Sequence, residues 1–317
     1  MSLKYRARLQ IPLAVCLIVA GLPKEFRAQI KVFARVQPNK DRININAEIY
    51  DPASNAYTAA AGPMLNARVF HTATRMTNGR ILITGGYDGL QYLSTAEIFD
   101  PLTGKSAETT KVDPTTSQAV ASNLTTGRQG HTATLLQNGM VLIVGGYNGT
   151  YLTSAELYNP ATGVFTLLSS NLTTPRAYHT ATLQFDGQVL IAGGYNGGYL
   201  SSLELFNPST RTFTQISPTL GSARAYHSAT LLTDGKVFFA GGYDGTNYLN
   251  TALVHNPSDL TIQLIAGKMT TSRDNHTATL LPDGKVIIAG GFNGSALATA
   301  ELFDPAAGSF TAVSSQM

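Results

Sequence analysis

Residues 176–208 read RAYHTATLQFDGQVLIAGGYNGGYLSSLELFNP, and this pattern returns along a chain of 317 residues. In each copy a histidine is followed 14 residues later by a Gly-Gly pair, then by an Ala-Glu step and a proline. The histidines are His71, His131, His179, His227 and His276, and the pairs begin at Gly85, Gly145, Gly193, Gly241 and Gly290. The glutamates are Glu97, Glu156, Glu204 and Glu301, with Leu253 in the fourth copy. Successive prolines from Pro52 to Pro305 lie 49, 59, 48, 49 and 48 residues apart, and a period near 48 predicts a propeller or an array.

Each copy has the pattern of four antiparallel strands. In the copy that begins at Arg176, residues 180–185 alternate as a first strand, and Asp186-Gly187 is a two-residue hairpin signal. The run 189–192 is wholly apolar, which indicates a strand that is buried on both faces. A third strand ends at Asn207-Pro208, because proline cannot donate to the ladder, and a fourth follows around Phe213. One such sheet cannot bury both of its faces alone, so the copies must stack.

Composition agrees with an all-β protein and excludes some functions. Charged residues make up 13%, about half of the roughly 25% typical of soluble domains, while there are 30 glycines. Residues 1–28 hold five Lys or Arg and one Glu, so the rest of the chain has 17 basic and 18 acidic side chains and a net charge of −1. A domain without a basic surface is not expected to bind nucleic acid or acidic membranes.

The N-terminus has the pattern of an export signal. Three basic residues at 4, 6 and 8 precede an apolar run at 11–22, which is too short for a stable membrane span. We expect cleavage after Ala28, with a retained anchor or lipidation of Cys16 as alternatives. Residues 29–317 would then be periplasmic, cell-surface or extracellular. Since Cys16 is the only cysteine, the exported domain would have no disulfides.

The repeat Arg-x-x-His, an apolar strand ending in Gly-Gly, and Glu-x-Tyr/Phe-Asp/Asn-Pro resembles the kelch repeat over residues 44–315. The resemblance implies an all-β kelch-type β-propeller. We expect five full four-stranded blades at 68–118, 128–170, 176–218, 224–266 and 273–313, and a sixth, incomplete blade of three strands at 30–61. The alternative is a chain that is shorter than its relatives. Kelch blades usually carry Trp in the fourth strand, whereas the matching positions here are Tyr57, Ser106, Phe165, Phe213, Ile262 and Phe310.

The repeated polar residues are interpreted first as structural. A histidine, glycine pair or glutamate that recurs in every blade is more simply a building part than a catalyst, and no catalytic or metal-binding set stands outside the repeat. The arginines three residues before each histidine should pair with the glutamates inside the blades, because an unpaired buried charge is costly. Leu253 would leave one of them without this partner. The alternative is that arginines at the channel mouth bind an anionic ligand, and the candidates are Arg128, Arg176 and Arg224.

The loops after the Gly-Gly pairs are the best candidates for a ligand-binding surface. In antiparallel sheets these B–C loops, between second and third strands, share one face of the disc with the D–A loops that carry the arginines. An insertion of 11 residues relative to the 48-residue period, which lies within 108–123, is expected on the same face. Tyrosines and turn residues there suit a carbohydrate or a protein, although both residue types also serve packing and turns. The candidates are Tyr92, Tyr151, Tyr199, Tyr248, Asp88, Asn148, Asn196, Asp244 and Asn293.

Three functions compete. We expect an exported, monomeric, non-catalytic scaffold that binds a carbohydrate or a protein and has no cofactor. The resemblance also allows a carbohydrate-active enzyme such as a sugar epimerase or mutarotase. The copper-radical chemistry of galactose oxidase needs a cysteine cross-linked to a tyrosine, which is excluded if the segment with Cys16 is removed. An intracellular kelch adaptor ranks last, because the leader predicts export.

Overall fold

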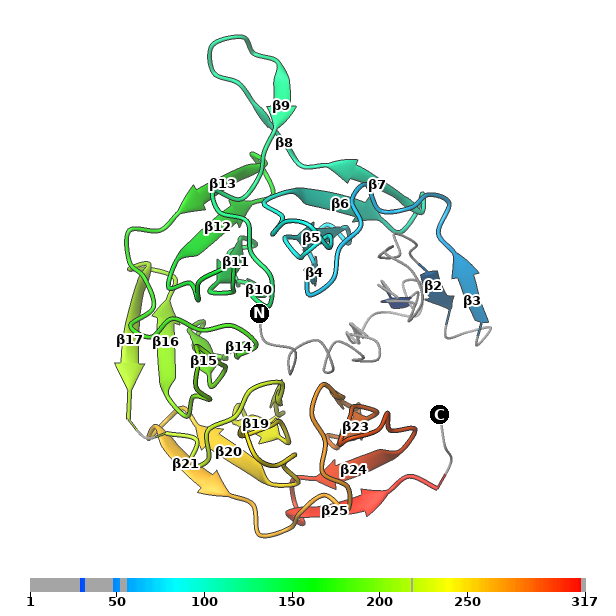
Figure 1. Cartoon of the computed structure of the whole chain (residues 1–317), viewed down its shortest axis with the longest axis vertical. Coiled ribbons are helices and arrows are strands. Elements are labelled where there is room, and N and C mark those ends of the chain that lie inside the picture. Colours follow the sequence, from blue (N-terminus) through cyan, green and yellow to red (C-terminus); the bar gives the residue numbers. More distant parts are fainter. Residues whose placement is uncertain (1–28, 32–47, 52–55, 218, 315–317) are drawn as a thin grey trace.

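The computed structural model describes residues 29–31, 48–51, 56–217 and 219–314, whose sheets are arranged as blades in a ring (Figure 1). The predicted export segment 1–28, including Cys16, lies outside the described residues. In the part of the chain that is described, no helix has the length and apolar character needed to cross a membrane.

Five blades have four strands each, in the order in which the strands occur in the chain. Blade 1 consists of β4 (Thr72–Arg75), β5 (Ile81–Thr84), β6 (Ala96–Asp100) and β7 (Lys105–Glu108). Blade 2 consists of β10 (Thr132–Leu135), β11 (Val141–Val144), β12 (Ala155–Asn159) and β13 (Val164–Leu167). Blade 3 consists of β14 (Thr180–Leu183), β15 (Val189–Ala192), β16 (Leu203–Asn207) and β17 (Thr212–Ile216). Blade 4 consists of β18 (Ser228–Leu231), β19 (Val237–Ala240), β20 (Ala252–Asn256) and β21 (Thr261–Leu264). Blade 5 consists of β22 (Thr277–Leu280), β23 (Val286–Ala289), β24 (Ala300–Asp304) and β25 (Ser309–Ala312).

A sixth sheet has three strands, as the sequence predicted. It consists of β1 (Gln29–Lys31), β2 (Glu48–Asp51) and β3 (Ala56–Ala59), paired in that order. Figure 1 shows β2 and β3 between blade 1 and blade 5. The chain after β3 is attached to blade 1, because the Gly62 N–H donates to the Gly104 carbonyl oxygen at 3.0 Å. The predicted strands at 30–36 and 43–50 lie partly outside the described residues.

The hydrophobic core lies between blades. All four residues are buried in each of β5, β11, β15 and β19, which confirms the prediction from their apolar runs. One core cluster joins Leu142 and Val144 of blade 2 to Val189, Ile191 and Phe206 of blade 3. Blades 1 to 5 therefore bury apolar faces against one another, which is the packing that a ring of blades provides.

The Gly-Gly corners are the closest contacts between blades. In blades 1 to 4 the N–H of the second glycine donates to the carbonyl oxygen of the repeated arginine in the following blade, as between Gly194 and Arg224 at 2.8 Å. The first glycine of that pair, Gly193, has a φ of +61°, and a Cβ there would lie 2.5 Å from the same oxygen. Glycine is required because any side chain would separate the two blades.

The histidines form a second connection between blades. In blades 2 to 5 the Nε2 atom of the histidine lies 2.8–3.0 Å from a hydroxyl of the preceding blade, in the pairs Thr72–His131, Thr132–His179, Thr180–His227 and Ser228–His276. Burial lowers the pKa of His71 to about 4 and that of His276 to about 3, and the neighbouring arginines add to this effect. Burial also holds the pKa of His131, His179 and His227 well below the usual value. The imidazoles are therefore neutral, and the structural interpretation is the one that their geometry supports.

The insertion at 108–123 was expected on the loop face, and that expectation was wrong. It forms a hairpin of β8 (Thr110–Val112) and β9 (Ala119–Ala121) that projects outward from the rim of the ring (Figure 1). It follows the outermost strand of blade 1, so its base starts at the rim.

Substitution of Gly193 by Ala should destabilise the fold more than the same change at Gly308. Both glycines have a φ of +61°, so the backbone strain is common to the two variants. Only Gly193 lies against the next blade, whereas nothing lies within 4 Å of a Cβ at Gly308. We expect an additional loss of about 1–3 kcal/mol in the free energy of unfolding for Gly193→Ala, measured by urea denaturation. Equal losses would contradict a close contact between blades at this corner.

Acid should destabilise the protein below pH ~6.5. The unfolded chain binds protons on its histidines near that pH, whereas the folded chain does not until the pH approaches their lowered pKa values. The contribution of the neutral histidines to the free energy of unfolding is therefore fully present above pH ~6.5. It falls as the pH decreases, by up to about 1.4 kcal/mol per pH unit for each histidine. Denaturant titrations between pH 6.5 and pH 5 measure this slope before most carboxylates titrate.

His255→Phe is the matched control for this titration. His255 is fully buried where other blades have Phe or Tyr, and among the described residues neither ring nitrogen has a hydrogen-bond partner. Burial lowers its pKa as well. The variant should gain about 1–3 kcal/mol at pH 7 and show a shallower slope. A flat stability profile in the parent protein would rule out buried neutral histidines.

Candidate functional site

The B–C and D–A loops meet on one face of the ring, as the sequence predicted. In each blade the aromatic residue after Gly-Gly forms bridges with a residue of the D–A loop and with a residue further along its own loop. Tyr147, for example, bridges to Gln129 on one side and to Tyr151 on the other. Three chain segments per blade therefore lie side by side at this face.

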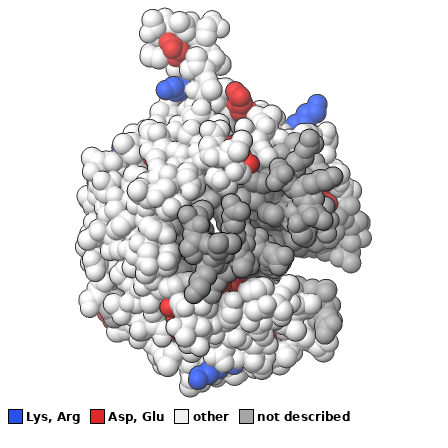
Figure 2. All heavy atoms as spheres, in the orientation of Figure 1, with Lys and Arg blue, Asp and Glu red and all other residues white. Residues whose placement is uncertain are grey.

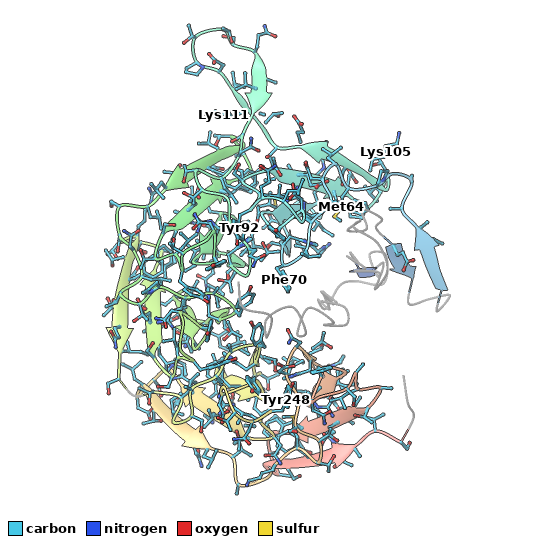
Figure 3. All side chains as sticks on the ribbon, viewed as in Figure 1. Met64, Phe70, Tyr92, Lys105, Lys111 and Tyr248 are labelled. Atoms are coloured by element: carbon cyan, nitrogen blue, oxygen red, sulfur yellow. The ribbon has the colours of Figure 1, made fainter. Side chains whose placement is uncertain are left out.

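Nine aromatic rings form a continuous arc across these loops, which we call the aromatic arc. Neighbouring ring centroids are 4.9–5.8 Å apart along its whole length. Pairs within a blade are tilted, and pairs between blades meet edge to face, a favourable geometry for aromatic rings. Figure 3 shows Tyr92 and Tyr248 on well-separated blades of the ring. The members are Tyr87, Tyr92, Tyr147, Tyr151, Tyr195, Tyr199, Tyr243, Tyr248 and Phe292.

The sequence left two interpretations open for the tyrosines, ligand binding and packing between blades, and the arc is compatible with both. The rings pack between blades, yet eight of the nine remain partly exposed, and only Tyr243 is buried. All four predicted tyrosines, Tyr92, Tyr151, Tyr199 and Tyr248, belong to it. A partly exposed ring that its neighbours hold in place offers apolar area at little cost in conformational entropy.

The Asp and Asn residues of the B–C loops shape the turns. The Asp88 carboxylate accepts the N–H groups of Leu90 and Gln91 at 2.8 and 2.7 Å, and Asp244 does the same for Thr246 and Asn247. Shorter versions of this turn occur at Asn148, Asn196 and Asn293. Their backbone role is clear, and their side chains remain partly exposed beside the arc.

A second set of residues was missed by the sequence analysis. The residue immediately before each repeated histidine has a φ between 50° and 61°. In blades 2 to 5 its N–H donates to the carbonyl oxygen of the equivalent residue in the preceding blade, at 2.7–3.2 Å. We call this set the inner collar, and Figure 3 shows Phe70 on the inner side of the ring. The members are Phe70, Gly130, Tyr178, Tyr226 and Asn275.

The inner collar carries aromatic side chains in a strained backbone conformation. A left-handed φ is unfavourable for bulky residues, and Gly130 shows that glycine fits the same position. The rings of Tyr178 and Tyr226 lie 4.7 Å apart, and Phe70 meets Tyr178 edge to face at 6.0 Å, across the blade that has Gly130. The signal in the sequence was an aromatic residue before three of the five histidines.

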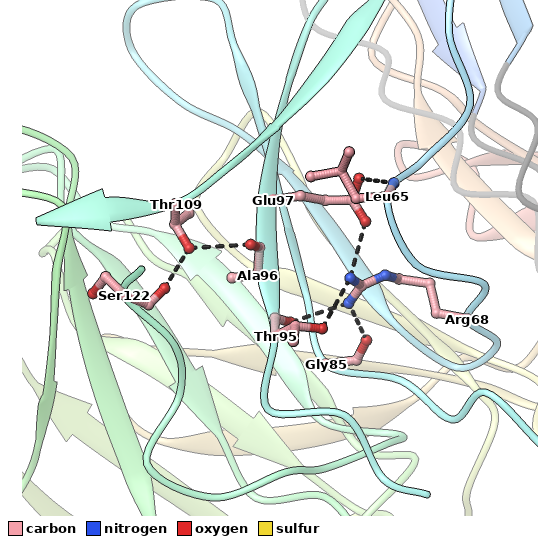
Figure 4. Close-up of polar contacts among 8 residues, drawn as sticks. All are labelled: Leu65, Arg68, Gly85, Thr95, Ala96, Glu97, Thr109 and Ser122. Carbon is pink, nitrogen blue, oxygen red and sulfur yellow. Dashed lines mark hydrogen bonds and ion pairs between the residues drawn. The ribbon is translucent and has the colours of Figure 1, made fainter. Parts of the chain in front are cut away.

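The expectation that Arg128, Arg176 and Arg224 contact a ligand is corrected by their burial, since each is at most 1% exposed. In blade 1, Arg68 donates to the carbonyl oxygens of Gly85 and Thr95 and to Glu97, whose other oxygen accepts the Leu65 N–H (Figure 4). The same ion pair recurs as Arg128–Glu156, Arg176–Glu204 and Arg273–Glu301 at 2.7–3.0 Å. Desolvation by burial lowers the pKa of Arg68, Arg128 and Arg176, and the attraction of their glutamates opposes that shift.

Blade 4 lacks this ion pair, as Leu253 predicted. Arg224 still donates to the Gly241 carbonyl oxygen and to Thr251, but no glutamate faces it within the described blades. Burial lowers its pKa to about 10, with an opposing effect from Asp244.

The glutamates, histidines and glycines of the repeat thus lie in the body of the blades. No group of three or more His, Cys, Asp or Glu side chains in the described residues could hold a metal ion.

Comparisons with known proteins agree with this architecture. The family model for the kelch-repeats domain of KLHDC2, KLHL20 and DRC7 matches residues 166–317, and the kelch motif model matches residues 68–107 and 130–172. No curated protein matches the chain.

Among solved structures, a copper-bound fungal alcohol oxidase of the AA5 family is similar, with a TM-score of 0.69 and 18% sequence identity. The similarity covers 90% of this chain but only 61% of the oxidase chain, so this chain spans less than two thirds of that structure. At this identity the likeness shows the fold alone. The repeated blades, the two kelch models and the shared ring place this chain in the kelch-repeat β-propeller family.

Proposed function

We propose that this protein is a non-catalytic scaffold that binds a carbohydrate or a protein through the face bearing the aromatic arc and the inner collar. The observation that supports it best is the strain at the collar. Three aromatic residues occupy a backbone conformation that glycine would adopt without cost, so their side chains serve something other than folding. They are partly exposed, and their D–A loops lie beside the B–C loops that carry the arc.

The chemistry of this face favours a neutral ligand. Asp88 and Asp244 are the only charged residues in the five B–C turns, and both carboxylates are engaged by backbone N–H groups. Among the described residues, charged side chains are sparse on the side of the molecule seen in Figure 2, where they lie mainly toward the margin. Tyrosine rings with hydroxyl tips suit sugar faces or the apolar side chains of a protein loop.

The same proposal places the protein outside the cytoplasm. Its support is the sequence of residues 1–28, with basic residues before a short apolar run. A sugar epimerase or mutarotase remains the alternative, and the test below is designed to distinguish it.

Tyr178→Gly and Tyr199→Ala should each weaken ligand binding about tenfold or more. Glycine at 178 matches Gly130 and relieves strain, so the fold is expected to tolerate it. Binding is measured first on a glycan array and then by calorimetry with each glycan that binds, and with candidate proteins if no glycan binds. Phe185→Ala is the control, because Phe185 is 64% exposed at the opposite ends of the strands.

The outcomes separate the functions. Binding that is lost in both variants, retained in Phe185→Ala, and accompanied by an unchanged NMR spectrum of the sugar supports the scaffold. Conversion of a bound sugar to its epimer or anomer would identify an enzyme. Binding that neither variant affects would place the ligand elsewhere and overturn the proposal.

A further inference from the structure

Asn-Gly steps occur at five places in the chain, and they fall into two structural classes. Two lie in the A–B turns, between the first and second strands of blades 1 and 2, at Asn78-Gly79 and Asn138-Gly139. Three lie in the B–C loops beside the aromatic arc, at Asn148-Gly149, Asn196-Gly197 and Asn293-Gly294. Since the dipeptide is the same, any difference in reactivity between the two classes comes from the fold.

An asparagine side chain can react with the backbone that follows it. The amide nitrogen of the next residue loses its proton and bonds to the asparagine Cγ, while the Cγ–Nδ2 bond breaks and ammonia leaves with that proton. Glycine favours this ring closure because it has no Cβ to obstruct the approach. Water then opens the cyclic imide at either carbonyl carbon. Aspartate or isoaspartate forms, and water is the only other reactant.

The attacking nitrogen is engaged in the A–B turns and unengaged in the B–C loops. Gly79 donates its N–H to the Met76 carbonyl oxygen, and Gly139 donates to that of Leu136, both at 3.0 Å. In the three B–C steps, no acceptor among the described residues binds the N–H of the glycine. A bound N–H must leave its acceptor before its nitrogen can attack, so hydrogen bonding protects the A–B turns.

The asparagine side chains are also held differently in the two classes. Asn78 and Asn138 each accept a backbone N–H on Oδ1 at 3.1 Å. In the B–C loops Asn148 and Asn196 accept one at 3.4 Å, which is longer than an N–H···O bond usually is. The described residues provide no hydrogen bond to the Asn293 side chain. The B–C asparagines therefore turn Cγ toward the next nitrogen at lower cost.

The B–C loops have room for the reaction and for its product. Their glycines, Gly149, Gly197 and Gly294, are exposed, and a Cβ at any of them would meet nothing within 4 Å. Ring closure reorients the peptide group, and isoaspartate lengthens the backbone, so both need this space. Aspartate already occupies the same loop position at Asp88 and Asp244, where backbone N–H groups bind the carboxylate.

We propose that Asn148, Asn196 and Asn293 are sites of spontaneous deamidation in the folded protein, whereas Asn78 and Asn138 are protected. Each conversion adds one negative charge to the face that bears the aromatic arc. Complete conversion places an acid in the B–C loop of each of blades 1 to 5, so a nearly neutral face becomes acidic as the protein ages. The chemistry does not depend on the function proposed for that face.

The test is incubation of the folded whole chain at mildly alkaline pH, with each Asn-Gly step followed by peptide mapping and mass spectrometry. We expect the three B–C steps to convert about tenfold faster than the two A–B steps, the factor that corresponds to release of one backbone hydrogen bond. Asn148 should be the slowest of the three, because the Thr150 hydroxyl also donates to its Oδ1 at 3.2 Å. The same chain in denaturant is the control, where all five steps should convert at similar rates.

Matched variants give a second readout by isoelectric focusing. The parent should develop a series of more acidic species, ending at the position of a variant that combines Asn148→Asp, Asn196→Asp and Asn293→Asp. A variant with Gln at the same three positions should show no such series over the same time, because glutamine would have to close a larger ring. Circular dichroism establishes that each variant is folded.

Two results would overturn the proposal. Equal rates at all five steps of the folded chain would show that the hydrogen bonds of the A–B turns give no protection. B–C steps that stay intact while the denatured chain converts would show that these loops hold their asparagines away from the next nitrogen. Neither result bears on ligand binding by the aromatic face, which is tested separately.

Discussion

The repeated buried arginine is the interaction on which the ring depends. Its carbonyl oxygen accepts the N–H of the Gly-Gly corner in the preceding blade, and its guanidinium donates to the corner of its own blade. The same side chain reaches the glutamate of the third strand, which in turn accepts N–H groups at the start of the D–A loop. One residue per blade thus connects a corner, a loop and the next blade. Since the charge is desolvated, removal of one partner costs far more than a surface ion pair would contribute.

This network explains which parts of the structure could be predicted from sequence. The spacing of His179, Gly193, Glu204 and Pro208 predicted four strands per blade, because each residue serves a contact that is local or between adjacent copies. The same repetition could not show whether a repeated side chain is buried inside the blade or exposed at the loop face. Arg176 therefore remained a ligand-binding candidate until its burial was known.

The aromatic arc and the inner collar depend on distances between blades, which no single copy of the repeat contains. The tyrosines were recognised, but their continuity across five blades follows from how far each blade is rotated against the next. The collar could not be predicted because the left-handed φ of Tyr178 is a backbone property that the residue type does not indicate. An aromatic residue at this position is equally compatible with ordinary packing beside the repeated histidine. The sequence showed where in the chain the 108–123 insertion occurs but not the direction in which it projects. That direction depends on the hydrogen bonds of Thr109 and Ser122 at the rim.

In a repeat protein, positions that recur maintain the scaffold, so departures from the repeat are where recognition can differ from one protein to another. Here the departures fall on two surfaces with different chemistry. The inner face varies at the collar, where Gly130 and Asn275 replace an aromatic residue, and remains nearly uncharged. The rim varies at one hairpin, which adds a wall to the groove between blades 1 and 2. Because the arginine network connects the blades that lie between them, a substitution at one surface need not disturb the other.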